Sequence, residues 1–204
     1  MRRIKLGIID DSIFCRNLTK LQLLNFNKVR FDFVLEAESI ADFQTKAEKT
    51  AVPEVILLDV MMPGIDGVSG IPIIKQKFPN THIIMLSDTI NPAIIRNSIL
   101  GGAYAFVNKG TKTCELVDII NDVLTGSCYA CPELTKSLFF GIQKPPQDRR
   151  KLSKRELHIV HRMLEGLSLQ KIAMSYKISI ERLWVLINRI IVKLNINYKH
   201  PFIG

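Results

Sequence analysis

The chain has 204 residues, which is long for one compact domain and comfortable for two. Its net charge of +9 lies in residues 149–204, which hold 12 Lys and Arg and 3 Asp and Glu, whereas residues 1–148 hold 16 residues of each sign. The basic C-terminal part predicts attraction to a polyanion, or else a solvated basic surface. With no apolar stretch of membrane-spanning length and no signal-peptide pattern, the composition argues against a membrane protein and predicts a cytoplasmic one.

Through residue 125, short apolar runs alternate with longer stretches that have helical apolar spacing, and turn or capping residues bound each run. This alternation is typical of a parallel sheet with crossover helices, so we expect an α/β fold with a doubly wound (βα)5 arrangement. The expected strands are residues 5–10, 31–37, 55–59, 82–87 and 105–108. The expected helices are residues 13–25, 39–49, 68–77, 92–100 and 114–124.

A sixth helix is expected at residues 132–140, followed by residues 141–150, where a Pro-Pro pair and a charge cluster predict an exposed linker. The domain boundary therefore falls near residue 150. Cys128 and Cys131 form a Cys-x-x-Cys pair, a zinc or redox pattern that here lacks a second pair or a nearby histidine. For these and the other two cysteines we expect reduced, partly buried thiols.

Beyond residue 150 the apolar periodicity is helical throughout. Ser153 and Glu156 form a capping box that opens one helix, which ends at Gly166 and carries Leu157, Val160 and Leu164 on one face. Ser168 caps a short helix, residues 177–178 turn the chain, and Ser179 caps a third helix to about residue 194, with a buried stripe of Leu183, Ile187, Ile190 and Leu194. Two helices joined by a tight turn predict a small all-α helix-turn-helix domain.

Polar side chains follow four of the five expected strands, where an open parallel sheet binds its ligands. These residues are Asp10 and Asp11, Asp59, Ser87, and Asn108 with Lys109. Carboxylates that converge on one pocket repel one another unless a cation is present, and oxygen ligands that leave room for water and phosphate suit Mg²⁺. A lysine opposite would neutralise a transferred phosphoryl group, with the Ser87 hydroxyl as a hydrogen-bond donor. The alternative is that each Asp merely caps the helix that follows it.

Residues 57–67, with the sequence Leu-Leu-Asp-Val-Met-Met-Pro-Gly-Ile-Asp-Gly, resemble a response-regulator receiver domain when Asp10-Asp11 and Lys109 are included. The resemblance covers residues 4–125 and implies a flavodoxin-like fold. It implies that Asp59 takes a phosphoryl group from the phosphohistidine of a sensor histidine kinase or phosphotransfer protein. By the same resemblance, Asp11, Asp59 and the backbone carbonyl of Met61 hold Mg²⁺, and Asp10 acts through a water molecule.

The resemblance also implies a switch pair, Ser87 and Phe106, in which Ser87 moves toward the phosphoryl oxygens and the aromatic ring turns inward. The physical logic is a bistable packing element biased by one new charge. The alternative is that Phe106 is only strand core. Asp88 departs from the family, which usually has a small residue there, and its carboxylate predicts slower uptake of phosphate than in Asp88→Ala.

The scaffold of residues 152–197 is similar to a LuxR-type DNA-binding domain, through Leu152-Ser153-Lys154-Arg155-Glu156, Glu165-Gly166-Leu167-Ser168, Lys171-Ile172-Ala173 and Lys193-Leu194. The whole chain therefore resembles a two-component transcription regulator of the NarL/FixJ class, which places its third helix in the major groove and binds paired half-sites as a dimer. The expected DNA-binding residues are Lys171, Arg182, Trp184, Val185, Asn188, Arg189 and Lys193.

The third helix departs from the family pattern at Arg182, Trp184 and Leu186, where Thr, Lys and often His are usual. A Trp cannot make the bidentate bond to guanine that gives about 1 to 3 kcal/mol of discrimination. Trp184 looks extra to the buried stripe, and three roles stay open for it: stacking on DNA, a protein interface, or core packing. Residues 198–204 contain a proline and so differ from the fourth helix that the family uses for dimerisation. This difference favours a homodimer formed through the receiver domains.

We thus expect a receiver domain at 1–128, a helical extension and linker at 129–150, and a helix-turn-helix domain at 151–204. The leading hypothesis is a phosphoacceptor protein, not an enzyme, that controls transcription as a homodimer on DNA. A second is a regulator that acts by pairing with another protein, with weak or no sequence-specific DNA binding of its own. A third is a phosphatase with Asp59 as nucleophile, which Met61 disfavours because a second carboxylate is needed at that position.

Overall fold

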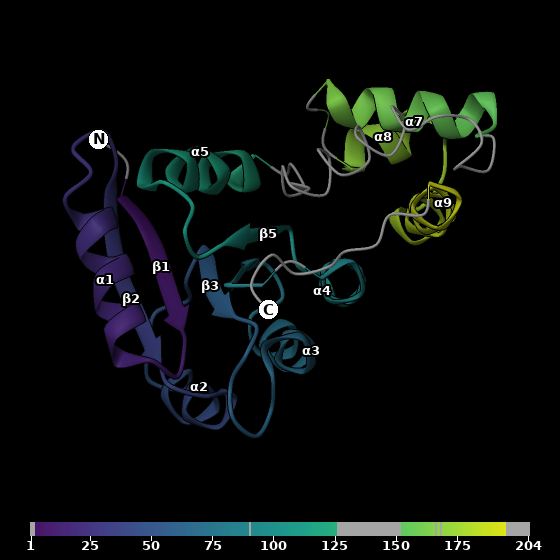
Figure 1. Cartoon of the computed structure of the whole chain (residues 1–204). Helices are drawn as coiled ribbons and strands as arrows, with labels where there is room; N and C mark the ends of the chain where they lie inside the picture. The colour runs from purple at the N-terminus through teal and green to yellow at the C-terminus, as the bar shows by residue number, and fades with distance from the viewer. Residues whose placement is uncertain (1–2, 90, 126–151, 166, 168, 195–204) are drawn as a thin grey trace, which may run out of the picture.

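The structure is a computed structural model, and it describes residues 3–89, 91–125, 152–165, 167 and 169–194. Its N-terminal half is built on a five-stranded, wholly parallel sheet in the order β2-β1-β3-β4-β5 (Figure 1). The strands are β1 (Arg3–Ile9), β2 (Arg30–Ala37), β3 (Val55–Asp59), β4 (His82–Ser87) and β5 (Ala105–Asn108). The predicted (βα)5 doubly wound fold is confirmed, with strand bounds that differ by no more than two residues.

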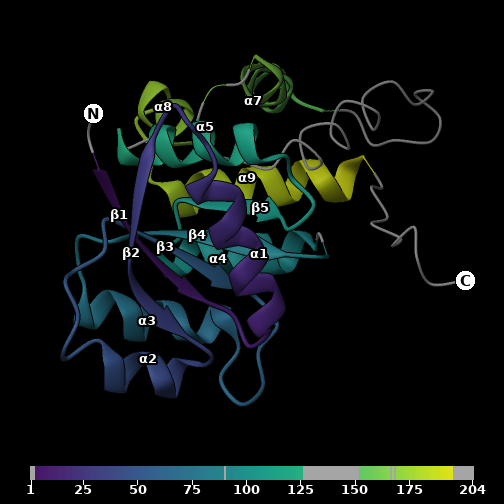
Figure 2. The same cartoon turned by 90° about the vertical axis from the view of Figure 1, so that its left-hand side faces the viewer.

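Five helices cover both faces of the sheet, as Figure 2 shows from the side. Helices α1 (Ile13–Leu24) and α5 (Thr113–Leu124) lie on one face, and α2 (Ile40–Lys46), α3 (Gly67–Lys77) and α4 (Pro92–Gly101) lie on the other. The middle strand, β3, has a run of apolar residues because helices cover both of its faces. Ile56 and Leu58 pack toward α2 and α3, while Val55 and Leu57 pack on the α5 side.

The order of the strands sets where the acidic residues meet. The chain runs from β1 outward to β2 and then returns to β3 on the other side of β1, so the strand order reverses between β1 and β3. Asp10 follows β1 and Asp59 ends β3, which places both carboxylates at the topological switch point, where such sheets bind ligands.

The C-terminal part is helical: α7 (Lys154–Leu164), α8 (Leu169–Ser175) and α9 (Ile180–Lys193). The predicted capping box is present, because the Ser153 hydroxyl accepts from the Glu156 N–H and the Glu156 carboxylate accepts from the Ser153 N–H at 2.7 Å. Ser179 caps α9, as expected. Lys177, in the turn between α8 and α9, has a φ of 53°, a conformation uncommon for a residue other than glycine. The predicted helix-turn-helix is confirmed.

The buried side of α7 is decided by its contacts with α8 and α9. Leu157 and Leu164 are each 38% exposed, whereas Ile159 and Met163 are buried beside Val160. The face that holds Leu157, Val160 and Leu164 is thus only partly buried, because packing against α8 and α9 covers the adjacent face of the helix. The stripe predicted for α9 is confirmed, since Leu183, Ile187, Ile190 and Leu194 are all fully buried.

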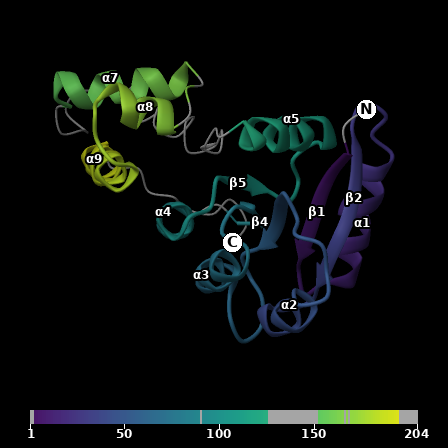
Figure 3. The same cartoon turned by 180° about the vertical axis from the view of Figure 1, so that it is seen from behind.

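Helix α9 also lies against α4 of the sheet-containing half, as Figures 1 and 3 show from opposite sides. Ile95 and Ile99 of α4 belong to the same buried cluster as the core of α7–α9.

Among the described residues, no helix is both long and apolar enough to cross a bilayer. The helix predicted at 132–140, the linker at 141–150 and the Cys128–Cys131 pair lie outside the described residues. Of the other two thiols, Cys15 is partly buried as expected, but Cys114 is exposed.

Candidate functional site

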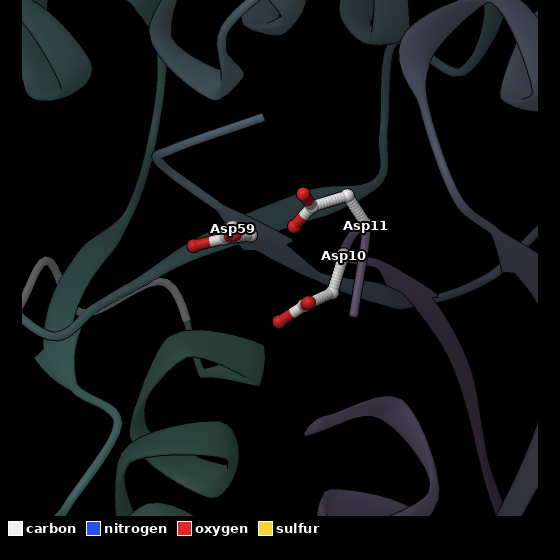
Figure 4. A group of neighbouring side chains, drawn as sticks. All are labelled: Asp10, Asp11 and Asp59. Carbon is white, nitrogen blue, oxygen red and sulfur yellow. The ribbon is translucent and has the colours of Figure 1, made fainter. Parts of the chain in front are cut away.

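Three carboxylates gather at the carboxyl ends of β1 and β3. Asp10 and Asp59 are buried, Asp11 is exposed, and one carboxylate oxygen from each lies within 4.8 Å of the others. Figure 4 shows the three side chains pointing into the same space from two neighbouring strands. The sequence prediction that Asp10, Asp11 and Asp59 lie together is met by this geometry.

The loop after β3 holds Asp59 by backbone packing that requires glycine. A Cβ on Gly67 would lie 1.9 Å from the Asp59 carbonyl oxygen, so no other residue fits there without moving the loop. The Gly67 N–H donates to the Val60 carbonyl at 2.9 Å, which closes the loop, and Gly64 has a φ of 79°. Asp66 then caps α3 by accepting from the Ser69 N–H at 2.7 Å. The Pro-Gly-Ile-Asp-Gly stretch is therefore the structural support of Asp59.

Lys109, directly after β5, enters the acidic cluster from the other side. Its Nζ lies 2.8 Å from Asp10 Oδ2 and 3.1 Å from Asp59 Oδ1, and its N–H donates to the Ser87 carbonyl at 2.9 Å. Burial opposes the charge of Lys109, but the hydrogen bond and charge of Asp10, together with Asp59, raise the pKa of the lysine well above its usual value. The lysine is thus a fixed cation beside Asp59.

The pKa of Asp59 stays raised although the Lys109 ammonium lies beside it. Burial raises its pKa above the ordinary value, and the nearby Asp10 carboxylate acts in the same direction. Lys109 and a hydrogen bond from the Met61 backbone oppose this rise without cancelling it. Asp59 therefore gains from any further positive charge that approaches its oxygens.

The donor set fits a divalent cation. Three carboxylates stand against the single charge of Lys109, which leaves about two negative charges for a dication to neutralise. Hard oxygen ligands of this kind suit Mg²⁺, which keeps several waters and uses few carboxylates. The Met61 side chain is exposed, so only its backbone lies close to Asp59. The prediction that the Met61 carbonyl is a ligand stays a prediction.

The residues of the predicted switch pair, Ser87 and Phe106, lie on the neighbouring strands β4 and β5. Ser87 is buried at the end of β4, and its hydroxyl donates to the Thr89 carbonyl at 2.8 Å and accepts from the Thr89 N–H at 3.1 Å. The Phe106 ring is fully buried on the α3–α4 side of the sheet. A move of Ser87 toward Asp59 would break both bonds to Thr89, and that move stays a prediction.

Comparison with known proteins decides the family. Residues 6–121 match the family model of the response regulator receiver domain, which is more than half of the chain. This chain belongs to the response regulator receiver domain family. The transcriptional regulatory protein UhpA of Escherichia coli is 29% identical over 175 residues, covering 83% of this chain and 81% of that protein. The response regulator protein VraR of Staphylococcus epidermidis is 25% identical over 195 residues, covering 95% of this chain and 91% of that protein.

Solved structures agree with this assignment at the level of the fold. The RcsB response regulator of Salmonella typhimurium superposes with a TM-score of 0.61 at 22% identity, over 98% of this chain and 95% of that chain. Both halves of the response regulator are included in that match. The resemblance to the NarL/FixJ class, on which the sequence analysis rested, is confirmed.

The predicted DNA-binding residues of the response regulator differ in exposure. Lys171, Arg182, Val185 and Arg189 are exposed on α8 and α9. The side chain of Asn188 lies outside the described residues. Trp184 is fully buried, and the expectation that it lies outside the buried stripe is wrong, because α9 buries this position as well in a cluster that continues into α4.

Lys193 is held by a partner that the sequence analysis did not connect to it. Its Nζ lies 2.7 Å from Oε2 of Glu156, which is buried at the start of α7. Burial would raise the pKa of Glu156, but the hydrogen bonds from Lys193 and from the Ser153 backbone lower it below the ordinary value. The capping box was visible in the sequence, whereas a contact between residues 37 positions apart was not.

Proposed function

We propose that Asp59 of this response regulator accepts a phosphoryl group and that the modification controls transcription through DNA binding by α7–α9. The observation that carries the proposal is the buried Asp59 carboxylate, 3.1 Å from the Lys109 ammonium and beside two further carboxylates. An Asp59 oxygen attacks the phosphorus of a phosphohistidine on a sensor kinase or phosphotransfer protein. The P–N bond breaks, an O–P bond forms, and the histidine leaves with its electron pair.

The residues around Asp59 have separate roles in that step. Lys109 neutralises charge on the phosphoryl oxygens, which approach its buried ammonium. Asp10, Asp11 and Asp59, with the Met61 carbonyl, would hold Mg²⁺, which when bound screens the carboxylates from the incoming anion. The Ser87 hydroxyl exchanges its bond to the Thr89 carbonyl for one to a phosphoryl oxygen.

The path from Asp59 to the helix-turn-helix runs through α4. The loop that contains Ser87 and Thr89 leads into α4, and α4 lies against α9. Because Trp184 is fully buried, the third helix presents only part of itself to solvent in this state. We propose that the move of Ser87 shifts α4 and loosens its contact with α9, so that α9 becomes available to the major groove.

The charge and exposure of the C-terminal part support DNA as its partner. Residues 149–204 carry a net charge of +9, and Arg182 and Arg189 are exposed on α9. UhpA is named a transcriptional regulatory protein, and a structure of RcsB is described as two dimers bound to two parallel DNAs. We propose the same partner and a homodimer here, with a receiver domain at 1–128, an extension and linker at 129–150, and a DNA-binding domain at 151–204.

The test is a selection of bound DNA from a random pool. The full chain is treated with acetyl phosphate and Mg²⁺, and the wild type is compared with Asp59→Asn, which keeps the shape of the side chain but cannot form the acyl phosphate. Asp118→Asn, an exposed change on α5, is the matched control. We expect enrichment of a paired sequence by the wild type and the control alone. Equal enrichment by Asp59→Asn would show that the switch does not govern the output.

A second function, pairing with another regulator, is favoured by the state of two predicted DNA contacts. Trp184 is buried and Lys193 is bound to Glu156, so α9 exposes fewer of the side chains that were predicted to contact DNA. Absence of any sequence preference in the same selection, with phosphorylation verified by mass, would favour that function. Turnover of small phosphate esters that is lost in Asp59→Asn would instead indicate a phosphatase.

A further inference from the structure

Every polar group of Asp10 is bound inside the chain. Its N–H donates to the Ala37 carbonyl at 3.1 Å, its Oδ1 accepts from the Ser12 N–H at 2.9 Å, and its Oδ2 lies 2.8 Å from the Lys109 ammonium. Its backbone carbonyl accepts a hydrogen bond from the guanidinium of Arg16, in the first turn of α1. Asp10 is therefore fixed from the ends of β2 and β5 and from α1 at once.

Asp11 contrasts with Asp10, because its carboxylate has no such anchor. The side chain is exposed, and among the described residues no hydrogen bond or ion pair holds it. One of its oxygens nevertheless lies within 4.8 Å of those of Asp10 and Asp59. The Asp10 carbonyl belongs to the planar peptide bond that joins Asp10 to Asp11, so a hydrogen bond to this carbonyl limits the direction in which the Asp11 side chain can point.

Arg16 is itself held between two groups. Its side chain is partly buried, and its charge acts on Asp42, in the first turn of α2. Burial opposes the effect, but a hydrogen bond from Lys46, a backbone hydrogen bond and the charge of Arg16 together hold the pKa of Asp42 below its ordinary value. Arg16 therefore connects the end of β1, through the Asp10 carbonyl, with the start of α2, through charge. A planar guanidinium with several N–H donors suits this double role better than an ammonium does.

We infer that Arg16 is a positioning residue for the acidic site: by fixing the Asp10–Asp11 peptide bond, it holds the Asp11 carboxylate where it can join Asp10 and Asp59 in binding Mg²⁺. The inference rests on the proposed function, because that function includes the magnesium site. Without Arg16, Asp10 keeps its other three bonds, whereas Asp11 loses the contact that orients it. The effect of Arg16 on the metal therefore passes through Asp11.

The charge of Arg16 alone predicts the opposite result. A cation beside the Asp10–Asp11 loop repels Mg²⁺, so its removal would strengthen metal binding if charge were its main contribution. If orientation of Asp11 is its main contribution, removal weakens metal binding instead. The sign of the change in Mg²⁺ affinity thus separates the two contributions.

The test measures Mg²⁺ binding by the full chain without any phosphoryl donor, as the rise in Tm across a Mg²⁺ titration. We expect Arg16→Met to bind Mg²⁺ about tenfold more weakly than the wild type, the scale typical of groups that orient a metal ligand. Arg16→Lys should lie between the two, because an ammonium can still donate to the Asp10 carbonyl. Lys20→Met is the matched control and should bind Mg²⁺ like the wild type, since Lys20 is also a partly buried cation of α1 but pairs with Glu36.

A double-variant cycle tests whether Arg16 acts through Asp11. Asp11→Asn should itself weaken Mg²⁺ binding, because it removes one of the three carboxylates. In that background, Arg16→Met should change the Mg²⁺ affinity by less than about twofold, since the side chain that Arg16 orients is no longer a charged ligand. A purely structural role of Arg16 would give the same loss in both backgrounds.

Equal or tighter Mg²⁺ binding by Arg16→Met would overturn the inference, and so would an equal loss in the wild-type and Asp11→Asn backgrounds. If circular dichroism shows that Arg16→Met does not fold, Arg16→Lys takes its place, and an affinity equal to that of the wild type would then overturn the inference. A wild type whose Tm does not respond to Mg²⁺ would overturn both the inference and the magnesium site. Failure of the DNA selection, with Mg²⁺ binding that depends on Arg16, would count against the proposed function alone.

Discussion

Replacing Lys109 by methionine removes the positive charge between Asp10 and Asp59 while keeping most of the side-chain volume. The Lys109 side chain is 15% exposed, and the side chains of Asp10 and Asp59 are 3% and 4% exposed. Each contact, near 3 Å, corresponds to roughly 5 kcal/mol of attraction at an effective dielectric constant of about 20, most of which offsets desolvation of the lysine. Loss of one partner of a buried ion pair costs about 3 kcal/mol or more, because the remaining charges stay uncompensated.

We therefore expect Lys109→Met to lower the free energy of unfolding by about 3 kcal/mol at pH 7 without Mg²⁺, which is roughly a 10 °C fall in Tm. The loss should shrink as the pH falls, starting above the ordinary range of an aspartate, because burial already raises the pKa of Asp59 and removal of the lysine takes away the cation that opposes this rise. Added Mg²⁺ should raise the Tm of the variant more than that of the wild type, because the cation replaces the missing charge.

The assay is thermal unfolding followed by circular dichroism, across a Mg²⁺ titration at pH 7 and across pH without metal. Lys112→Ala is the matched control, since Lys112 is exposed and makes no side-chain hydrogen bond at the start of α5. Equal Mg²⁺ shifts in the wild type and in Lys109→Met would refute the reasoning, because the lysine and the cation would then not act on the same carboxylates.

Three further changes test separate parts of the structure. Glu156→Gln should destabilise α7–α9 by about 1 to 3 kcal/mol at pH 7 in urea unfolding. Because the pKa of Glu156 is lowered in the folded state, the difference should begin to shrink near the usual value of a free glutamate, about 4.3, and should vanish only below the lowered pKa; Glu165→Gln is its exposed control. Gly67→Ala, whose Cβ would lie 1.9 Å from the Asp59 carbonyl oxygen, should abolish phosphorylation or folding, whereas Gly101→Ala, whose nearest contact is 3.4 Å, should be tolerated. Asp88→Ala should take up phosphate from acetyl phosphate roughly two- to fivefold faster at low salt, and an unchanged rate would show that this exposed carboxylate does not repel the donor.

The acidic site was predictable from the sequence because its parts are tied to strand ends. The carboxyl ends of parallel strands meet at one edge of the sheet, so the positions of Asp10, Asp59 and Lys109 after apolar runs were enough to bring them together. The bonds of the Ser87 hydroxyl to Thr89 were not predictable, since they depend on the conformation of a loop and not on a periodic pattern.

The helical half shows the opposite case. Periodicity predicted α7, α9, the capping box and the buried stripe of α9, but it predicted neither the buried side of α7 nor the burial of Trp184, because distant elements decide both. Trp184 is buried in a cluster that includes α4 residues more than 80 positions earlier, and Lys193 is bound by Glu156. The same reason explains α1, where spacing predicted a helix but gave no sign that its apolar face would point outward.

The acidic site and the third helix are joined by one route, because the loop after Ser87 leads to α4 and α9 lies against α4. Trp184 is the single tryptophan of the chain and is fully buried in the cluster that includes α4 residues, so its emission reports the contact between α9 and α4. If the proposed shift of α4 loosens this contact, acetyl phosphate with Mg²⁺ should change the Trp184 emission of the wild type and leave that of Asp59→Asn unchanged. An unchanged emission in the phosphorylated wild type would show that α9 stays on α4, and the release of α9 would then not be the step that phosphorylation controls.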